Sequence, residues 1–269
     1  MVSSLCVVLP AYNEEGRLGP ALDELFAFLC SPQAAGLPAE VRVLVVDDGS
    51  TDGTAALVRA RPEFSEAGAV ASRPGCPTLR LLAIGHGGKG SAVRAGMLAS
   101  DCDLIVFADA DMATPPDQLI KLVAALESAD IALGSRIQPD GSDMRATQPP
   151  FRRLVGRIFR VGAQIWVTGG VRDTQCGFKG FTRAAAHDLF GRLKVTSIVF
   201  DVDLIYLARC RGYRIAVVPI VWSDRRGSRM HARLGLALRV AFDLFRIRFA
   251  HVGVRRLDRE ARPEAERRP

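Results

Sequence analysis

The sequence predicts an α/β fold with a mostly parallel sheet and helices on both of its faces. Short apolar runs bounded by turn residues are typical of buried strands, and the first half of the chain contains five of them: Leu5–Leu9, Val41–Val46, Leu79–Ile84, Leu104–Ala108 and Ile131–Gly134. Helix-forming segments stand between several of these runs. Strands that alternate with helices form parallel sheets, so this half of the chain predicts such a sheet.

The helices follow from the spacing of apolar residues. Leu18, Leu22, Leu25 and Leu29 recur at helical intervals after the first strand. Thr54 or Asp52 is a candidate cap for a helix that carries Ala55, Leu57 and Val58. The remaining expected elements are a helix through Ala92 to Leu98, a basic amphipathic helix with Arg153, Arg157 and Arg160 on one face, a turn-rich loop over Asp173–Lys179, a helix opening at Phe200, a last strand over Arg214–Val221, and a final helix over about Met230–Phe249.

Length and composition limit the classes of protein to which this chain can belong. With 269 residues, 48% of them hydrophobic, the chain is long enough for one large domain or two small ones. Six scattered cysteines without a C-x-x-C pair are typical of buried thiols in a reducing compartment. We find neither a signal-peptide pattern nor an uncharged apolar run of the ~20 residues that a membrane-spanning helix needs. A cytoplasmic protein is therefore expected.

Positive charge is concentrated near the C-terminus. The net charge is +7, and residues Arg225 to Arg256 contribute nine arginines against the single acid Asp243. Such a surface suits an anionic partner, which is a nucleic acid, an anionic membrane or a phosphate-bearing substrate. Tyrosine and tryptophan are scarce there, and no nucleic-acid-binding module pattern is present, so we expect no nucleic-acid partner.

Two carboxylates, Asp109 and Asp111, follow the apolar strand Leu104–Ala108 directly. Ligands of open α/β sheets collect at the carboxyl ends of strands. Alternation along an extended chain predicts that both carboxylates point the same way. Oxygen ligands without a nearby His or Cys suit a divalent cation that also holds substrate phosphates. A turn with solvated aspartates is an equal alternative on this motif alone.

Glu14 and the pair Asp47-Asp48 also stand at strand ends, so three acidic ends converge on one edge of the predicted sheet. A carboxylate there can accept hydrogen bonds from a nucleotide base or ribose. The alternative is that Asp47 and Asp52 build turns, and for Asp52 we favour that alternative.

The segment Gly85-x-Gly87-x-x-Gly90 matches the dinucleotide-binding fingerprint. In that fold the glycine-rich turn follows the first strand, whereas here it follows the third. We therefore favour a glycine-lined turn in which Lys89 neutralises a phosphate or a neighbouring acid.

Six motifs in order resemble those of family 2 glycosyltransferases with the GT-A fold, and most of all the dolichyl-phosphate β-glucosyltransferases and their polyprenyl-phosphate relatives. The motifs are Pro10-Ala11-Tyr12-Asn13-Glu14, Val46–Thr54, Gly88-Lys89-Gly90, Asp109-Ala110-Asp111, Gly134-Ser135-Arg136 and Asp173–Lys179. The resemblance covers about residues 4–250. It implies one catalytic domain over 1–255, with a nucleotide-sugar-binding half (about 4–137) and an acceptor-binding half with interfacial helices (about 138–255). The charged tail, 256–269, is expected to be disordered.

The resemblance also assigns residues. It implies that Pro10, Ala11, Tyr12, Glu14 and Asp48 cradle the nucleotide, that Lys89 and Ala110 belong to the donor site, and that Asp109 and Asp111 bind Mg²⁺ or Mn²⁺, with Asp111 as the main ligand. Arg136 is expected near the donor diphosphate, and the basic residues expected to grip phosphates of donor or acceptor are Arg152, Arg225 and Arg229. Three features depart from the family: His86 replaces a frequent Asn, Arg229 replaces a frequent Lys, and no spanning helix is found.

The implied reaction is an inverting transfer of hexose from a nucleotide sugar to a polyprenyl phosphate. UDP-glucose is favoured over GDP-mannose because Asp173–Lys179 resembles the glucosyl subgroup. An ionised phosphate needs no base, whereas a hydroxyl acceptor would need one, with Asp201 or Asp173 as candidates. For Asp201 the alternative is an acid that stabilises a helix N-terminus.

Two other functions remain open from the sequence: a soluble relative with a sugar or small-molecule acceptor, and a non-catalytic nucleotide-sugar-binding or membrane-docking protein. The arginines that flank the apolar stripe of Met230–Phe249 favour a helix lying in the membrane interface, and hence a peripheral enzyme on the cytoplasmic face. An ordinary core-facing helix is the alternative.

Overall fold

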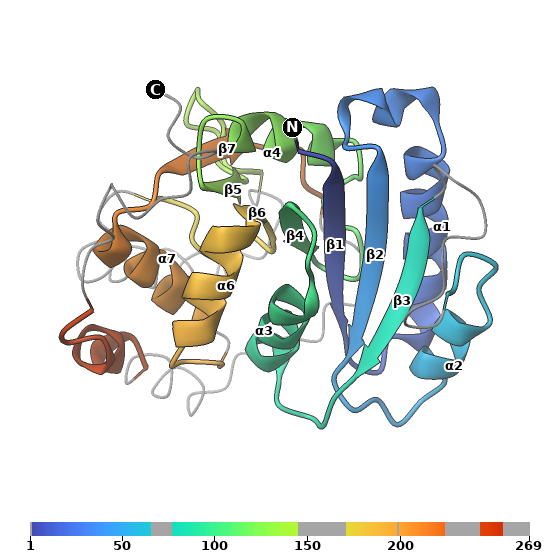
Figure 1. The fold of residues 1–269 in the computed structure, drawn as a ribbon, viewed down its shortest axis with the longest axis horizontal. Helices are drawn as coiled ribbons and strands as arrows, with labels where there is room; N and C mark the ends of the chain where they lie inside the picture. The colour runs from blue at the N-terminus through green and yellow to red at the C-terminus, as the bar shows by residue number, and fades with distance from the viewer. Residues whose placement is uncertain (1, 66–76, 145–170, 198, 224–242, 255–269) are drawn as a thin grey trace.

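A single sheet organises the part of the chain that the computed structural model describes, which is residues 2–65, 77–144, 171–197, 199–223 and 243–254. Its seven strands lie in the order β3-β2-β1-β4-β6-β5-β7 (Figure 1). They are β1 (Ser4–Ala11), β2 (Glu40–Asp47), β3 (Thr78–Ala83), β4 (Leu104–Ala108), β5 (Ile131–Ser135), β6 (Phe178–Thr182) and β7 (Ile215–Pro219).

Strand β6 is antiparallel to both of its neighbours, β4 and β5, and the other strands all run in one direction. The chain builds β1, β2 and β3 toward one side and then returns to place β4 on the other side of β1. Such a reversal of strand order is the place where ligands bind in open α/β sheets. The predicted mostly parallel α/β sheet is confirmed.

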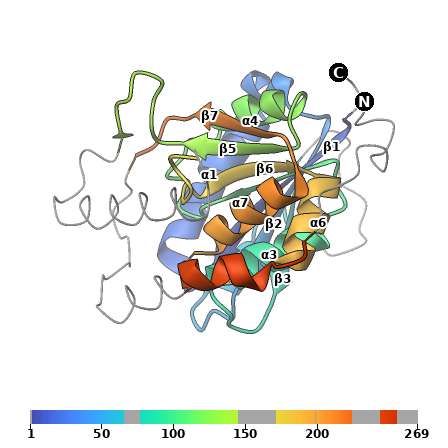
Figure 2. The same cartoon turned by 90° about the vertical axis from the view of Figure 1, so that its left-hand side faces the viewer.

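Helices cover both faces of the sheet (Figure 2). They are α1 (Glu15–Leu29), α2 (Thr54–Arg59), α3 (Lys89–Ala99), α4 (Gln118–Leu126), α6 (Arg183–Arg192) and α7 (Phe200–Arg211), with a 3₁₀ helix η1 (Pro32–Gly36) after α1. Leu5, Val7 and Leu9 of β1 pack with buried residues of α1 and α4, whereas Cys6 and Val8 face α3, α6 and α7. The alternation of β1 side chains therefore separates two apolar cores.

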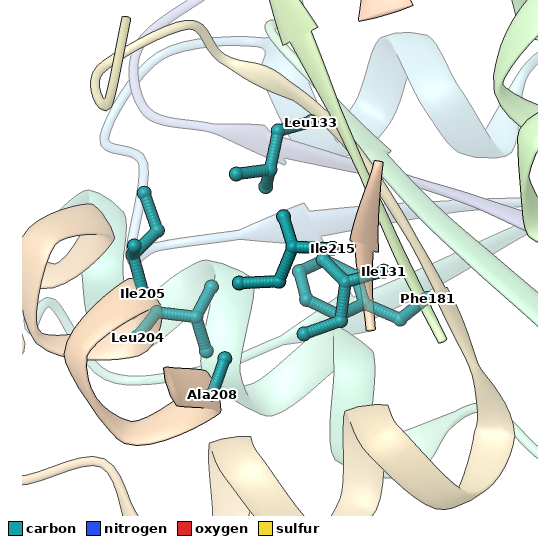
Figure 3. Close-up of a pocket in the computed structure, with 7 residues that line it drawn as sticks. All are labelled: Ile131, Leu133, Phe181, Leu204, Ile205, Ala208 and Ile215. Carbon is teal, nitrogen blue, oxygen red and sulfur yellow. The ribbon is translucent and has the colours of Figure 1, made fainter. Parts of the chain in front are cut away.

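Part of the core between α7 and the far strands consists of apolar side chains. Figure 3 shows a small hollow there, lined by Ile131, Leu133, Phe181, Leu204, Ile205, Ala208 and Ile215. None of these side chains can hold a phosphate or hydrogen-bond a sugar, so this hollow is a packing feature and not a candidate active site.

All six predicted strands are present, and so are the predicted helices that correspond to α1, α2, α3 and α7, but α4, α6, η1 and β6 were not predicted. Helix α4 carries Leu119, Leu122, Val123 and Leu126 at helical spacing, so its signal was present in the sequence. Strand β6 was missed because its first residues belong to the segment predicted as a turn-rich loop, and Lys179 interrupts its apolar pattern. The last strand is shorter than predicted, ending at Pro219.

Several predicted features lie outside the described residues. These are the basic amphipathic helix around Arg153 to Arg160 and the tail 256–269. Of the predicted final helix, the structure describes a helix over 243–250. Among the described residues, no helix is long and apolar enough to cross a membrane.

Candidate active site

The predicted acidic strand ends do meet at one edge of the sheet. The carboxyl ends of β1, β2, β3, β4 and β5 share this edge, because these strands run in one direction. Strand β6 runs the other way, so the loop over 173–177 that precedes it also reaches this edge. Loops from both halves of the chain therefore surround the end of β4.

Asp109 and Asp111 stand in a tight turn and not in an extended segment. The Met112 N–H donates to the carbonyl oxygen of Asp109 at 3.0 Å, and Met112 has a φ of 48°. The Ala113 N–H donates to Oδ1 of Asp111 at 3.2 Å. The expectation that strand alternation orients both carboxylates is therefore wrong; the turn orients them, and Ala110 between them is buried.

Cations flank both carboxylates. The Lys89 ammonium lies 2.5 Å from Oδ1 of Asp109, which confirms the prediction that Lys89 neutralises a neighbouring acid. The Arg17 guanidinium lies 3.9 Å from Oδ2 of Asp111 and also donates from Nε to Glu14 at 2.7 Å. Arg17 was not singled out in the sequence. Its only signal was its position three residues after Glu14, on the first turn of the following helix.

Charge and burial shift the pKa values of this cluster. Burial raises the pKa of Asp111, and the like charge of Asp109 raises it further. Partial removal from water acts to lower the pKa of Lys89, whose side chain is 41% exposed, but the carboxylates of Asp109, Asp201 and Asp111 outweigh it, so the pKa is raised and the ammonium stays charged. Because burial and Asp109 disfavour the charged form of Asp111, a further cation beside it would stabilise that form.

Gly177 lets the loop before β6 pack against Asp109. A Cβ atom added at Gly177 would overlap the carboxylate atoms of Asp109. The antiparallel pairing of β6 with β4, which sets Phe178 opposite Ala108, brings the two residues together. Glycine at position 177 therefore leaves the space in which the Asp109 carboxylate lies.

The carboxylate pair fits a divalent cation of the Mg²⁺ or Mn²⁺ type. Its donors are oxygens, as these ions prefer. Within the described ranges, no group of three or more His, Cys, Asp or Glu side chains could hold a metal by itself. Asp109 and Asp111 would thus bind the ion together with oxygens from a substrate or water, which is typical of a metal carried with a phosphate.

Asp48 anchors the loop after β3. It is 2% exposed and accepts hydrogen bonds from the backbone N–H groups of Gly87 at 2.8 Å and Gly88 at 2.9 Å. The ring Nδ1 of His86 lies 2.9 Å from Oδ2 of the same carboxylate. The His86 ring in turn stacks on Tyr12, with ring centroids 4.3 Å apart. Asp48 thus shapes the region expected to receive the nucleotide.

The residues around Asp48 either end strand β1 or build the turns that follow β2. Pro10 and Ala11 end β1, and the Asp48 N–H donates to the Ala11 carbonyl at 2.9 Å. Oδ1 of Asp47 accepts from the Ser50 N–H at 3.0 Å, and Asp52 accepts from the Thr54 N–H at 3.0 Å. The favoured interpretation of Asp52 as a turn-building residue is confirmed, and Asp47 has the same role.

Arg136 is held by Asp173. Its Nε and Nη2 donate to the two carboxylate oxygens at 2.9 Å and 2.7 Å, and its backbone N–H donates to Oδ2 at 2.8 Å. The guanidinium also lies 5.5 Å from the centre of the Trp222 ring. The pairing with Asp173 outweighs burial and raises the pKa of Arg136, so the positive charge is permanent. Asp173 occupies one edge of the guanidinium, which limits the directions from which Arg136 can contact a diphosphate.

Asp201 is buried with Lys179. The ammonium lies 2.5 Å from Oδ1 of Asp201 and also donates to the Cys176 carbonyl. Burial raises the pKa of Asp201, although the charges of Lys179 and Lys89 oppose the rise. The remaining predicted site residues, Arg152, Arg225 and Arg229, lie outside the described residues.

A family model described as Glycosyl transferase family 2 matches residues 6–190. The chain belongs to glycosyl transferase family 2. The predicted family and enzyme class are therefore confirmed. The dolichyl-phosphate β-glucosyltransferase of Drosophila melanogaster is 39% identical over 84% of this chain and 69% of its own length. A dolichyl-phosphate β-glucosyltransferase of Trichomonas vaginalis is 36% identical over 89% of this chain and 69% of its own length.

Solved structures share the fold of this family 2 glycosyltransferase. Glucosyl-3-phosphoglycerate synthase from Mycobacterium tuberculosis with bound UDP has a TM-score of 0.61 at 20% identity, covering 96% of this chain and 82% of that one. The same synthase with Mn²⁺, UDP and glucosyl-3-phosphoglycerate has a TM-score of 0.57 at 19% identity, over the same shares of the two chains. At this identity the likeness shows the fold, which confirms the predicted GT-A class.

Proposed function

We propose that this glycosyltransferase transfers glucose from UDP-glucose to a polyprenyl phosphate, with a divalent metal ion and with inversion at the anomeric carbon. The similarity to dolichyl-phosphate β-glucosyltransferases from several organisms supports the sugar and the acceptor class. Residues of about 4–137 would bind the nucleotide sugar, and residues of about 138–255 would bind the acceptor.

The observation that carries the acceptor proposal is that both candidate bases are buried in ion pairs. The Asp173 side chain is 1% exposed and bound by Arg136, and the Asp201 side chain is 6% exposed and bound by Lys179. A hydroxyl acceptor needs a base that can reach its proton. A phosphate monoester has lost its protons by neutral pH, since its second pKa is about 6. This arrangement supports an acceptor that arrives already ionised.

The proposed reaction is one displacement. An oxygen of the acceptor phosphate forms a bond to the anomeric carbon from the side opposite the diphosphate. The bond between that carbon and the diphosphate oxygen breaks, and its electron pair leaves with UDP. Because one bond forms as the other breaks on the opposite face, an α-linked donor gives a β-linked product.

The residues around Asp109 and Asp111 would stabilise the leaving group. Mg²⁺ or Mn²⁺ bound there would supply positive charge against the diphosphate. Lys89 and Arg17 add permanent positive charge on either side of the carboxylates. Arg136, held by Asp173, stays the candidate for a further contact with the diphosphate, and Arg152, Arg225 and Arg229 stay predicted phosphate ligands.

We also propose that the enzyme works at a membrane surface, on the cytoplasmic face. In the helix over 243–250, Phe245 and Phe249 are 55% and 57% exposed, whereas Ile247 is fully buried. Arg246 and Arg248 are also exposed on this short helix. Exposed aromatic side chains among arginines are typical of a helix that lies in an anionic interface, which supports the proposal, while Ile247 and Leu244 of the same helix pack against the core.

The test is transfer of radiolabel from UDP-glucose, with GDP-mannose in parallel, into products that partition into organic solvent. Polyprenyl phosphate in vesicles is compared with free sugars and 3-phosphoglycerate as acceptors. We expect label in the lipid phase from UDP-glucose only. Label that stays in water-soluble products would overturn the lipid acceptor, and lipid labelled from GDP-mannose alone would overturn the donor.

A further inference from the structure

His86 belongs to no motif that the proposed function uses, yet its ring is held in a defined position. Nδ1 faces two acceptors, Oδ2 of Asp48 at 2.9 Å and the Asp48 carbonyl at 3.1 Å. Because both are acceptors, Nδ1 carries the proton. Asp48 is itself buried and fixed by two backbone N–H groups. The ring orientation of His86 is therefore set by the fold, although its side chain is 56% exposed.

The fixed ring of His86 supports Tyr12. The two rings are stacked, with centroids 4.3 Å apart and an angle of 25° between their planes. Tyr12 follows β1 directly and is 41% exposed. Two adjacent, half-exposed rings at the carboxyl edge of the sheet present an aromatic surface, and such surfaces stack nucleobases.

Short chain segments connect the rings of Tyr12 and His86 to the carboxylates of Asp109 and Asp111. Lys89 comes three residues after His86 and pairs with Asp109. Glu14 comes two residues after Tyr12 and pairs with Arg17, which approaches Asp111. A nucleoside diphosphate with its phosphates at the carboxylates would thus have its base directed toward the aromatic pair.

We propose that His86 is a nucleobase-positioning residue that acts by holding the Tyr12 ring against which the donor base stacks. The proposal rests on the proposed nucleotide-sugar donor. The contribution comes from the ring of His86, since stacking needs a flat face, and the bond from Nδ1 to Asp48 orients that ring. Stacking on an aromatic side chain is sequence-tolerant, and loss of the ring that supports Tyr12 should weaken affinity for the nucleotide about tenfold.

The experiment compares His86→Ala, His86→Asn and His86→Phe in the whole protein, with thermal unfolding as the check on folding. Affinity for UDP is measured by calorimetry with Mn²⁺, and inorganic pyrophosphate is the matched probe that has no base. We expect His86→Ala and His86→Asn to weaken UDP binding about tenfold and to raise KM for UDP-glucose with little change in kcat, while pyrophosphate binding is unchanged. His86→Phe, which keeps a flat ring, should restore most of the UDP affinity.

A double-mutant cycle with Tyr12→Ala tests whether His86 acts through Tyr12. We expect His86→Ala to have little further effect on UDP affinity when Tyr12 is already absent. Equal weakening of UDP and pyrophosphate, a change in kcat alone, or full additivity of the two substitutions would overturn the proposal. If the wild-type protein binds no UDP at all, the proposed donor is wrong, which is a separate outcome.

Discussion

The ammonium of Lys179 lies 2.5 Å from Oδ1 of Asp201, and the lysine side chain has no exposed surface. This ion pair joins β6 to the first turn of α7 beneath the candidate site. Lys179 also lies 5.2 Å from the centre of the Phe107 ring of β4. A charge buried so completely is stable only with its partner, so the pair fixes the antiparallel strand against the helix.

Removal of one partner of this pair should destabilise the protein strongly. Lys179→Met leaves Asp201 buried without its counter-charge, and we expect a loss of roughly 3–5 kcal/mol in the free energy of unfolding. Lys179→Met combined with Asp201→Leu should lose less than the lysine substitution alone, because no isolated charge stays buried. Urea unfolding of both variants and the wild type checks this. Equal stability of the single variant and the wild type would show that the pair is unimportant.

Asp201→Asn tests whether this carboxylate is a base. Asparagine keeps an oxygen that can accept from Lys179 but cannot take a proton. With an ionised acceptor we expect kcat to fall by less than about tenfold, whereas loss of a general base costs roughly 10²–10⁴-fold. The measurement is kcat for transfer to polyprenyl phosphate at saturating donor. A drop in the larger range would assign Asp201 as the base.

Lys89→Met should increase the affinity of the free enzyme for Mn²⁺. The ammonium of Lys89 occupies an oxygen of Asp109, and the metal must compete with it. Both side chains are more than a third exposed, which limits such a pair to about 1 kcal/mol, or an increase of up to about fivefold. Titration of free Mn²⁺ by electron paramagnetic resonance checks this, with Lys89→Arg as the control that keeps the charge. Unchanged or weaker affinity in Lys89→Met contradicts the competition.

Gly177→Ala should impair transfer without unfolding the protein. The added Cβ would overlap the Asp109 carboxylate, which is the flexible end of a side chain and can move away. Misplacement of such a group costs roughly 10–100-fold in rate. Gly191→Ala in α6 is the matched control, since a Cβ there meets nothing within 4 Å and alanine favours a helix by ~0.5–1 kcal/mol. Equal activity of the two variants would show that Gly177 does not place Asp109.

Asp188 should make the protein acid-sensitive. Burial acts to raise its pKa, but hydrogen bonds from Arg192, Arg211 and Tyr213 outweigh burial and lower the pKa below its usual value. A lowered pKa in the folded state gives stability above the unfolded pKa of about 3.9, which is lost as the pH falls through the folded value.

Asp188→Asn should therefore cost about 2 kcal/mol at neutral pH, since hydrogen bonds to charged groups are worth ~1.5–3 kcal/mol. The difference from wild type should shrink as the pH falls below the unfolded pKa of about 3.9 and vanish below the lower folded pKa, where the native carboxylate is protonated too. Urea unfolding at several pH values measures it, and a pH-independent difference would contradict the assignment.

Much of the fold was readable in the sequence because local patterns matched the final environment. The strands β1 to β5 contain the predicted apolar runs, which are largely buried in β1, β4 and β5, and their carboxyl ends meet because parallel strands share an edge. For the same reason, the sequence alone indicated a metal site at Asp109 and Asp111, and a role for Lys89 in neutralising a phosphate or a neighbouring acid. The unusual place of the glycine-rich turn, after β3, was enough to disfavour a dinucleotide site.

The features that the sequence did not predict depend on contacts between distant segments. β6 has five residues, a lysine at its second position and an antiparallel direction, and its place between β4 and β5 involves contacts with distant residues, among them the ion pair of Lys179 with Asp201. The stacking of His86 on Tyr12 joins segments that follow β3 and β1, which are not neighbours in the sheet. Neither relationship leaves a periodic signal in the sequence.

The proposed reaction is metal-assisted, inverting transfer of glucose to a lipid phosphate at the Asp109 and Asp111 carboxylates. The most direct measurement is the formation of glucosyl phosphate lipid from UDP-glucose by the wild type and by Asp111→Ala, with and without Mn²⁺. Proton NMR of the product gives its anomeric configuration. We predict a β-linked product that requires Mn²⁺ or Mg²⁺ and falls at least about 100-fold in Asp111→Ala, as is typical when stabilisation of a developing charge is lost. An α-linked product, or full activity in Asp111→Ala, would contradict this account.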